Sequence, residues 1–279
     1  MIDFDKIWVE KYRPAKLDDI ILDERTLNIV KEFKKEIPNL LFVGNPGTGK
    51  TTLARVIVND ILGCNYLYIN ASDESGIDTI RHNITNFAQT KSFDGGIKVV
   101  ILDEADGLTP QAQAALRNTM ETFAKYCRFI LTANYKHKII PALQSRCQAL
   151  DIKPVIELAV KRCYYILKNE KVKISDEQKK KFVQLVKRFF PDLRKAINEL
   201  QKNVIDSELC IASINSDNEL LETVYKKIVG KKSLEARKYL IENEDRFQGD
   251  YDTLLANFLN YIYNTNLQDA QKKAFIANI

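Results

Sequence analysis

Four short apolar runs alternate with helical patterns between residues 39 and 152, and this alternation constrains the fold more than any other feature. The runs are rich in Val, Ile, Leu and Phe, as buried parallel strands are, and they cover 39–43, 66–70, 98–103 and 128–134. Helical patterns lie between them at 51–62, 78–89 and 111–125. Thr109 and Pro110 open the last of these as a cap and first-turn pair. The alternation predicts an α/β domain with a mostly parallel sheet.

The pattern changes near Lys153 and Pro154, after which we expect no strand. Three helical patterns follow, at 155–170, 175–189 and 191–204. Ser175, with Glu177 and Gln178 behind it, is a suitable start for the second. A break near Ile214–Glu219 precedes further helical patterns. We therefore expect an α/β domain (1–152), a small helical domain (153–213) and a helical C-terminal domain (214–279).

Composition leaves several classes of protein open. The formal net charge of +5 permits a partner with a phosphate backbone, and it equally fits a basic surface that serves solubility. The five cysteines are scattered without a C-x-x-C pair, so we expect neither a zinc ribbon nor a disulfide framework. The N-terminal residues lack an apolar signal segment, and no run approaches the length of a membrane span. We expect a soluble, cytoplasmic protein.

Residues 44–51 read G-N-P-G-T-G-K-T and match the phosphate-loop pattern G-x-x-x-x-G-K-[ST]. An apolar run precedes the match and a helical pattern follows it, which is the context that this pattern requires. Glycines let backbone N–H groups turn toward phosphates, and the helix N-terminus adds partial positive charge. We expect Lys50 to bridge the β- and γ-phosphates of a nucleotide and the Thr51 hydroxyl to help hold Mg²⁺.

Two acids, Asp103 and Glu104, follow the third apolar run. Asp103 is suited to orient Mg²⁺, directly or through water, and Glu104 to polarise an attacking water. Acids at a strand end are often only surface charge, but a phosphate loop lies about fifty residues upstream of these two. The letters D-E-A-D at 103–106 also suggest a helicase. Such helicases need a second nucleotide-binding domain, and no second set of strands follows.

Three further polar residues have ordinary interpretations beside functional ones. Asn134 ends the fourth apolar run, where it could orient water beside a γ-phosphate or simply begin a turn. Arg194 lies in a helical pattern of the second domain and could reach phosphates from a lid or only face solvent. Arg146 has no evident task in this chain's own site, so it could complete a neighbour's site as an arginine finger. Spacing alone does not place it in another subunit.

Seven stretches between about residues 8 and 205 resemble AAA+ clamp-loader ATPases of the replication factor C small-subunit type. They are W-V-E-K-Y-R-P (8–14), G-N-P-G-T-G-K-T (44–51), N-A-S-D-E-S-G-I-D-T-I-R (70–81), L-D-E-A-D (102–106), A-L-R-N-T-M-E (115–121), S-R-C (145–147) and D-L-R-K-A-I-N-E-L (192–200). S-R-C is especially specific to clamp loaders. F-P-D-L-R-K (190–195), and I-T-N-F-A (84–88) followed by S-F-D-G (92–95), resemble the T-even-type phage motor subunit. The resemblance implies a phage protein that acts in the host cytoplasm.

The resemblance implies an α/β AAA+ domain, a helical lid and a helical collar, with ATP and Mg²⁺ as cofactors. It assigns the adenine to Val9, Glu10 and Tyr12, with Ile21 beyond them, and the phosphates to Gly47, Thr48, Gly49, Lys50, Thr51 and Thr52. Thr51 and Asp103 would hold Mg²⁺, and Glu104 would activate water. Asn134 and Arg194 would be the two sensors of the nucleotide. Arg146 would act in trans, in the ATP site of the adjacent subunit.

The resemblance also implies contacts with DNA and with a sliding clamp. Ile77 and Arg81, at the start of a helix, would follow the template-strand backbone without sequence preference. Without the family, Arg81 would be an ordinary exposed helix residue. The stretch from Phe87 to Phe93 would lie toward the clamp, although Phe87 also fits the apolar face of its helix.

Three functions are compatible with these motifs to different degrees. In the first, the chain joins copies of itself and a distinct subunit in a pentamer, opens a sliding clamp and grips primer–template DNA on binding ATP, and releases the closed clamp on hydrolysis. The second is an assembly subunit with an idle site, against which the complete set of site residues argues. The third is another AAA+ ATPase, such as a helicase loader or a Holliday-junction motor. The collar patterns end about one helix short of the family's, so either the chain is truncated or its ring closes differently.

Overall fold

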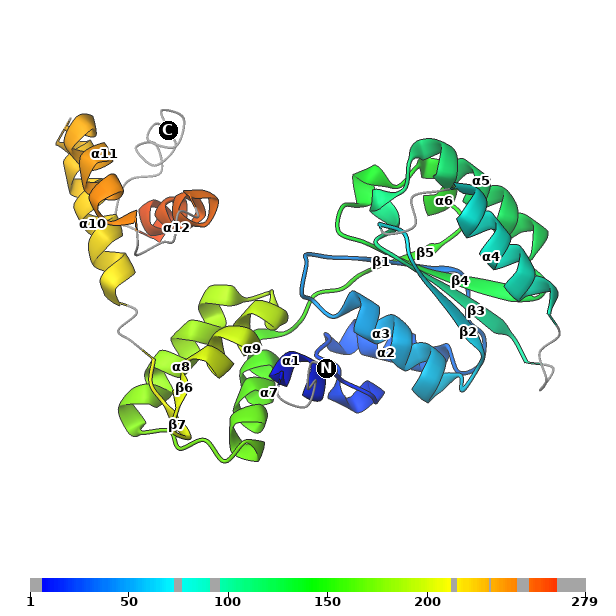
Figure 1. Ribbon diagram of the computed structural model, residues 1–279, viewed down its shortest axis with the longest axis horizontal. Coiled ribbons are helices and arrows are strands. Elements are labelled where there is room, and N and C mark those ends of the chain that lie inside the picture. The colour runs from blue at the N-terminus through cyan, green and yellow to red at the C-terminus, as the bar shows by residue number, and fades with distance from the viewer. Residues whose placement is uncertain are drawn as a thin grey trace. The chain divides into compact units, whose positions relative to one another are not determined.

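The computed structural model describes residues 7–72, 77–90, 96–211, 215–230, 232–244 and 251–264. Side chains at 77–81, 215–219 and several positions of the last helix lie outside this description. The chain divides into two compact units, Met1–Cys210 and Ile211–Ile279. The first unit contains a sheet covered by helices on both faces and a set of lid helices (Figure 1).

Five parallel strands form the sheet, in the order β2-β3-β4-β1-β5. They are β1 (Leu40–Val43), β2 (Tyr66–Asn70), β3 (Lys98–Asp103), β4 (Cys127–Ala133) and β5 (Gln148–Asp151). Residues of β3 are buried along the whole strand, because helices cover both faces, and this explains its continuous apolar sequence. The prediction of an α/β domain with a parallel sheet is confirmed.

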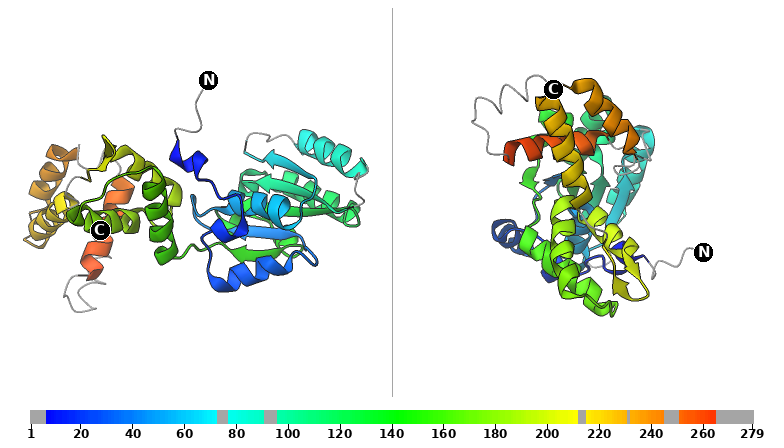
Figure 2. Two further views of the ribbon diagram at one scale, coloured as in Figure 1. Left: turned by 90° about the horizontal axis from the view of Figure 1, so that it is seen from below. Right: turned by 90° about the vertical axis from the view of Figure 1, so that its left-hand side faces the viewer.

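Alternate residues of each strand enter two separate cores. Helices α2 (Glu24–Glu32) and α3 (Lys50–Val56) cover one face, where Leu40 and Phe42 pack. Helices α4 (Ile77–Gln89), α5 (Pro110–Thr122) and α6 (Pro141–Gln144) cover the other, where Leu41 packs (Figures 1 and 2). The carboxyl ends of the strands therefore meet at one edge of the sheet, between these two layers.

Local signals fix where the helices begin. Thr109 caps α5 by accepting a hydrogen bond from the Ala112 backbone N–H, with Pro110 at the first position. Ser175 caps α8 (Asp176–Phe189) in the same way. Both predicted starts are confirmed. After Val56, α3 widens into a π-helical turn, η3 (Ile57–Ile61), and α5 ends three residues before the predicted limit of 125.

The remaining part of the first unit is helical, with one exception. The lid contains α7 (Ile156–Asn169), α8 and α9 (Leu193–Lys202). Two-residue strands β6 (Val204–Ile205) and β7 (Glu208–Leu209) then form an antiparallel hairpin. No strand was expected after residue 153, so the hairpin corrects the sequence interpretation. Its strands are too short to show any alternation of apolar residues.

Short elements complete the first unit. A short helix, α1 (Trp8–Lys11), and a 3₁₀ turn, η2 (Leu17–Asp19), lie near the N-terminus, and α1 contacts α9. Two further 3₁₀ turns follow strands at the edge of the sheet, η4 (Ala105–Gly107) after β3 and η5 (Lys136–Lys138) after β4.

The second unit has its own core. Its described helices are α10 (Asn215–Val229), α11 (Ser233–Glu242) and α12 (Tyr251–Asn264). They bury Leu220, Leu221, Val224, Ala236, Phe258 and Ile262 against one another. Among the described helices, none has the length and apolar character that crossing a bilayer requires.

Candidate functional site

The loop between β1 and α3 has the backbone geometry of an anion cradle. Gly47 and Gly49 have φ angles of 75° and 93°, in the left-handed region that favours glycine. A Cβ atom on Gly44 would lie 2.7 Å from the Ile152 carbonyl oxygen, so the loop also passes close to the end of β5. Helix α3 begins at Lys50, directly after Gly49, and presents its N-terminal N–H groups to the loop.

Lys50 is almost fully buried at the centre of this loop. Its Nζ donates hydrogen bonds to the carbonyl oxygens of Gly44 and Asn45, at 2.8 and 2.9 Å, and to Asn134 Oδ1 at 2.8 Å. Burial lowers the pKa of the Lys50 amine, and Asp103 opposes this change. The predicted lysine and the predicted asparagine are therefore in direct contact, although 84 residues separate them.

Hydroxyl groups surround the Asp103 carboxylate. Thr51 and Thr132 donate to its Oδ1 at 2.7 and 2.6 Å, and Tyr68 donates to its Oδ2 at 2.8 Å. These residues come from α3, β4 and β2, so three elements fix the carboxylate of β3. The hydroxyl and carboxylate oxygens are the ligand type that Mg²⁺ prefers, and the donor set therefore fits that ion.

Glu104 begins a turn in an unusual conformation. Its φ of 55° is left-handed, which turns the side chain away from the line of β3. The carboxylate accepts a hydrogen bond from Ser72 Oγ at 2.8 Å, and its backbone N–H donates to Thr132 Oγ1 at 3.0 Å. Glu104 thus lies beside Asp103 at the edge of the sheet, with its carboxylate held by a serine.

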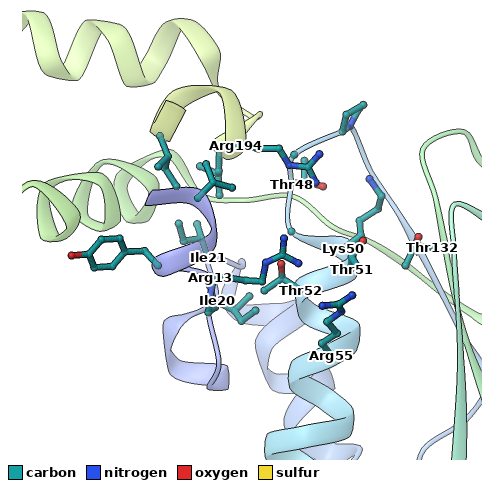
Figure 3. A pocket seen from close by; sticks show the side chains of 18 of the residues that line it. Arg13, Ile20, Ile21, Thr48, Lys50, Thr51, Thr52, Arg55, Thr132 and Arg194 are labelled. Atoms are coloured by element: carbon teal, nitrogen blue, oxygen red, sulfur yellow. The ribbon is translucent and has the colours of Figure 1, made fainter. Parts of the chain in front are cut away.

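A cavity of about 380 Å³ brings these groups together with the N-terminal segment and the lid (Figure 3). That size is within the range of small-molecule sites. The predicted residues that line it are Val9, Tyr12, Ile21, Gly47, Thr48, Gly49, Lys50, Thr51, Thr52, Asp103, Glu104, Asn134 and Arg194. Its lining also includes the apolar side chains of Val9, Ile20 and Ile21. The cavity therefore offers both apolar groups suited to a base and a loop suited to phosphates.

Glu10 does not line the cavity among the described residues. Its carboxylate forms an ion pair with Arg13, 2.6 Å away, and Arg13 is the residue that points into the cavity (Figure 3). Among the described residues, Glu10 is therefore next to the cavity through its ion pair with Arg13 and does not line it.

The N-terminal segment is attached to the lid by polar contacts. The Tyr12 hydroxyl and the Lys11 amine both donate to Glu170 Oε1 at 2.6 Å. Burial raises the pKa of Tyr12 to about 12, and the hydrogen bond to Glu170 adds to this. Burial also raises the pKa of Glu170, but the hydrogen bonds from Lys11 and Tyr12 outweigh it and leave that pKa lowered. Arg162 of α7 donates to the Tyr12 carbonyl oxygen at 3.1 Å.

The lid also contacts the phosphate loop directly. The Leu193 backbone N–H donates to the Gly47 carbonyl oxygen at 3.2 Å. Asp192 caps α9 by accepting from the Lys195 N–H at 3.0 Å, and its carboxylate lies against Gly47. Arg194, which follows Leu193, lines the cavity at this contact between the lid and the phosphate loop (Figure 3).

Arg146 lies outside this cavity. It follows α6, and its guanidinium donates to the Ala142 carbonyl oxygen at 2.9 Å and forms an ion pair with Glu121 of α5. About a third of its side chain is exposed to solvent, at 34%. Arg146 thus does not line the cavity that contains the phosphate loop of its own chain.

The residues expected to contact DNA and the clamp lie partly outside the described residues. Ile77 and Arg81 belong to the first turn and a half of α4, whose side chains are not described. Phe87 is partly buried against the core, as its place on the apolar face predicted. Residues 91–93 of the expected clamp stretch lie outside the described residues.

Sequence reasoning missed five polar residues that line the cavity: Arg13, Arg55, Tyr68, Thr132 and Arg162. The sequence could have indicated Thr132, because it is a polar residue near the end of β4, two residues before Asn134. Tyr68 lies two residues before Asn70, which pairs with Asp103 across the sheet, but this needs the strand register.

Comparison with known proteins places this site in a class. Residues 40–154 match the model of the ATPase family associated with various cellular activities (AAA). Residues 152–210 match the lid domain of the sliding-clamp-loader large subunit, an AAA+ ATPase. A solved structure of a RuvB mutant from Thermotoga maritima has the same fold, with a TM-score of 0.54, 20% identity, and 79% of this chain and 81% of that chain covered. The chain is an AAA+ ATPase that binds ATP.

Curated relatives narrow the class. The replication factor C small subunit of Archaeoglobus fulgidus is 38% identical over 97% of this chain and 88% of that protein. The same subunit of Picrophilus torridus is 42% identical over 80% of this chain and 72% of that protein. Replication factor C subunit 3 of the eukaryote Blastobotrys adeninivorans is 42% identical over 80% and 65%. The chain belongs to the replication factor C small-subunit family of clamp-loader ATPases.

Proposed function

We propose that this chain is a catalytically active motor subunit of a sliding-clamp loader. The observation that carries the proposal is the direct contact of its site residues. Lys50 bonds to Asn134, Thr51 bonds to Asp103, and Glu104 lies beside Asp103 at one cavity. A subunit retained only for assembly has no need of this arrangement, which therefore argues against the idle-subunit alternative.

The phosphate end of the cavity suggests a role for each residue. The N–H groups of Gly47, Gly49 and the first turn of α3 surround the phosphates, with Thr48 and Thr52 at the loop. Lys50 exchanges its bonds to the Gly44 and Asn45 carbonyl groups for the β- and γ-phosphates. Asn134 orients the attacking water.

A magnesium ion fits beside this loop. Thr51 and Asp103 would hold it, because their oxygens lie 2.7 Å apart in the site and are suited to a hard cation. When bound, Mg²⁺ supplies positive charge that neutralises the charge developing on the phosphates. Glu104 accepts the proton of the water once Ser72 releases its carboxylate.

The apolar end of the cavity accepts the adenine in this proposal. Val9, Tyr12 and Ile21 line that end, and Glu10 acts there through its ion pair with Arg13. Arg194 reaches the phosphates from the lid. Because Leu193 bonds to the phosphate loop, binding of ATP changes the position of the lid relative to that loop.

Arg146 acts on the neighbouring subunit in this proposal. It is remote from its own cavity and partly exposed, so it is available to the ATP of an adjacent subunit. Hydrolysis then depends on assembly, as in other enzymes that receive an arginine finger in trans. The chain joins copies of itself and a distinct subunit, in a pentamer, and acts on a sliding clamp and on primer–template DNA. Ile77 and Arg81 contact the template backbone.

The remaining expectations are also proposals. We divide the chain into an AAA+ domain (1–152), a lid (153–213) and a collar (214–279) that is used for assembly. The F-P-D-L-R-K and S-F-D-G stretches support an origin in a T-even-type phage, and so action in the host cytoplasm. A helicase-loader role is disfavoured by the S-R-C stretch around Arg146.

The test is steady-state ATP hydrolysis by the chain assembled with its distinct partner subunit. We expect clamp and primed DNA together to raise the rate strongly. Lys50→Ala removes turnover, and Arg146→Ala removes the stimulated rate, by about a thousandfold or more if the finger has its usual effect. Arg25→Ala is the matched control, because Arg25 is an exposed arginine of α2. A rate indifferent to clamp and DNA in a complex shown to be assembled would contradict the proposal.

A further inference from the structure

Tyr68 forms a hydrogen bond with Asp103 Oδ2, the carboxylate oxygen to which Thr51 and Thr132 do not donate. It lies on β2, two residues before Asn70, which pairs with Asp103 in the register of β2 and β3. The Tyr68 hydroxyl donates to Asp103 Oδ2 at 2.8 Å, whereas Thr51 and Thr132 both donate to Oδ1. The carboxylate is therefore fixed at both oxygens, and rotation about its last bond would break a hydrogen bond.

The guanidinium of Arg55 lies over the face of the Tyr68 ring. It lies one helical turn after Thr51 on α3, and its guanidinium carbon is 4.6 Å from the centroid of the Tyr68 ring. This is a cation–π distance. Arg55 Nε is buried and has no hydrogen-bond partner among the described residues. Figure 3 shows Arg55 beside Thr51 and Thr52 at the cavity.

The Tyr68 hydroxyl acts here only as a donor to a carboxylate oxygen, and at 2.8 Å it is well placed for a charge-assisted hydrogen bond.

We propose that Tyr68 is a positioning residue for Mg²⁺: it fixes Asp103, and thereby the Thr51 hydroxyl, while Arg55 fixes Tyr68. This inference rests on the proposed function, in which the site binds ATP with Mg²⁺. A hydroxyl that donates its proton to a carboxylate keeps its oxygen lone pairs for a cation. The orientation of Asp103 therefore decides where Thr51 directs those lone pairs. In this proposal Tyr68 acts through Asp103 and is not itself a ligand of the ion.

A purely structural role would use the ring of Tyr68 and not its hydroxyl. The ring packs against the core that lies between α3 and the sheet, so loss of the whole side chain would disturb folding in either case. Tyr68→Phe keeps the ring and the contact with Arg55 and removes only the donor. A change in the Mg²⁺ affinity of Tyr68→Phe would therefore support the positioning role of the hydroxyl, and no change would leave only a structural role for the ring.

The experiment uses the full chain and the fluorescent nucleotide N-methylanthraniloyl-ATP. Its affinity is measured first in EDTA, and Mg²⁺ is then titrated at a fixed nucleotide concentration. For Tyr68→Phe we expect the affinity in EDTA to stay within about twofold of wild type. We expect the half-saturating Mg²⁺ concentration to rise about tenfold, the lower end of the losses seen when groups that orient metal ligands are removed. Tyr66→Phe, on the same face of β2, should change neither value.

Two results for Tyr68→Phe overturn the inference and leave the proposed function intact. One is an unchanged Mg²⁺ midpoint. The other is an equal loss of affinity in EDTA and in Mg²⁺, which would mean that Tyr68 contacts the nucleotide or supports the fold. Failure of the wild-type chain to bind the nucleotide under both conditions would overturn the proposed function together with the inference.

Arg55→Leu is the second variant. Removal of the guanidinium loosens the ring without removing its hydroxyl, so we expect a smaller rise in the Mg²⁺ midpoint, about threefold for a cation–π contact of ordinary strength. Affinity in EDTA should again be unchanged. An equal loss of affinity in EDTA would make Arg55 a direct phosphate ligand and would overturn its part in the inference.

Discussion

Arg146 is held inside its own chain by Glu121, although the proposed function requires it to reach another subunit. The two side chains are 34% and 48% exposed, so the ion pair is largely solvated. Exposed pairs of this kind contribute about 0–1 kcal/mol. Breaking the ion pair with Glu121 therefore requires little free energy. The pair can still position Arg146 until the ATP of a neighbouring subunit competes for its guanidinium.

We predict that Glu121→Gln raises ATP hydrolysis by the assembled complex in the absence of DNA. The expected increase is up to about fivefold, the factor that corresponds to about 1 kcal/mol of lost ion pairing. The free energy of unfolding of the chain should change by less than about 0.5 kcal/mol, as for other surface substitutions. Steady-state ATPase assays and urea unfolding measure the two quantities.

The control for this prediction is the double variant Glu121→Gln with Arg146→Ala. It should lose the increase completely, since the increase requires the freed guanidinium. A fall in the rate of Glu121→Gln alone would contradict the prediction. It would indicate that Glu121 supports the assembled site and does not restrain the finger.

At the scale of elements, the phosphate loop and the lid are in contact through one glycine. Gly47 has a φ of 75°, and a Cβ atom there would lie 1.8 Å from Asp192 Oδ1 and 3.1 Å from Asp192 Cα. Asp192 cannot simply rotate away, because its Oδ1 also accepts the Lys195 N–H that caps α9. The loop conformation and the start of α9 therefore depend on each other.

We predict that Gly47→Ala destabilises the chain without nucleotide by about 2–5 kcal/mol. The left-handed backbone costs an alanine about 1–2 kcal/mol, and the overlap with Asp192 adds about 1–3 kcal/mol. Gly49→Ala is the matched control: its φ is 93°, but nothing lies within 4 Å of its Cβ position, so only the backbone cost applies. Urea unfolding measures both. Equal losses of unfolding free energy for the two variants would show that the overlap with Asp192 of the lid has no effect on stability.

The elements and the site differ in how far the sequence could predict them. Strands β2 and β3 were predicted at their observed limits. In β3, burial along the whole strand leaves an unbroken apolar run, whereas β2 is a largely half-buried edge strand that still has an apolar sequence. The hairpin at Val204–Leu209 has strands of two residues, which are too short for any periodicity. Lys50 and Asp103 belong to contiguous motifs. Tyr68 does not, because its role depends on the register of β2 with β3 and on side chains of α3, which is a separate element.

Glu10 illustrates the limit of a family resemblance at this scale. Glu10 and Arg13 are three residues apart at the end of one short helix, and the sequence does not say which of them faces the cavity. The fold decides it, because Arg13 lines the cavity and Glu10 pairs with it. Arg55 was missed for a similar reason, since its partner ring lies on a separate element.

At the scale of the whole molecule, the nucleotide cavity belongs to one unit alone. Every residue that lines it lies between Val9 and Ile197, before the boundary at Cys210. The first unit has its own cores on both faces of the sheet, and the second unit buries a separate cluster around Leu221 and Phe258. If the second unit is the collar that the proposed function requires, its removal separates nucleotide binding from assembly.

We predict that a chain ending at Cys210 binds N-methylanthraniloyl-ATP with an affinity within about twofold of the full chain, because all cavity residues and their supporting contacts are retained. We also predict that it fails to assemble with its distinct partner subunit, since the proposed collar is absent. Nucleotide titration and size-exclusion chromatography with light scattering measure the two properties. A loss of affinity beyond about tenfold, or 1.4 kcal/mol, would mean that the second unit supports the site. Normal assembly of the shortened chain would instead place the subunit contacts in the first unit, where Arg146 lies.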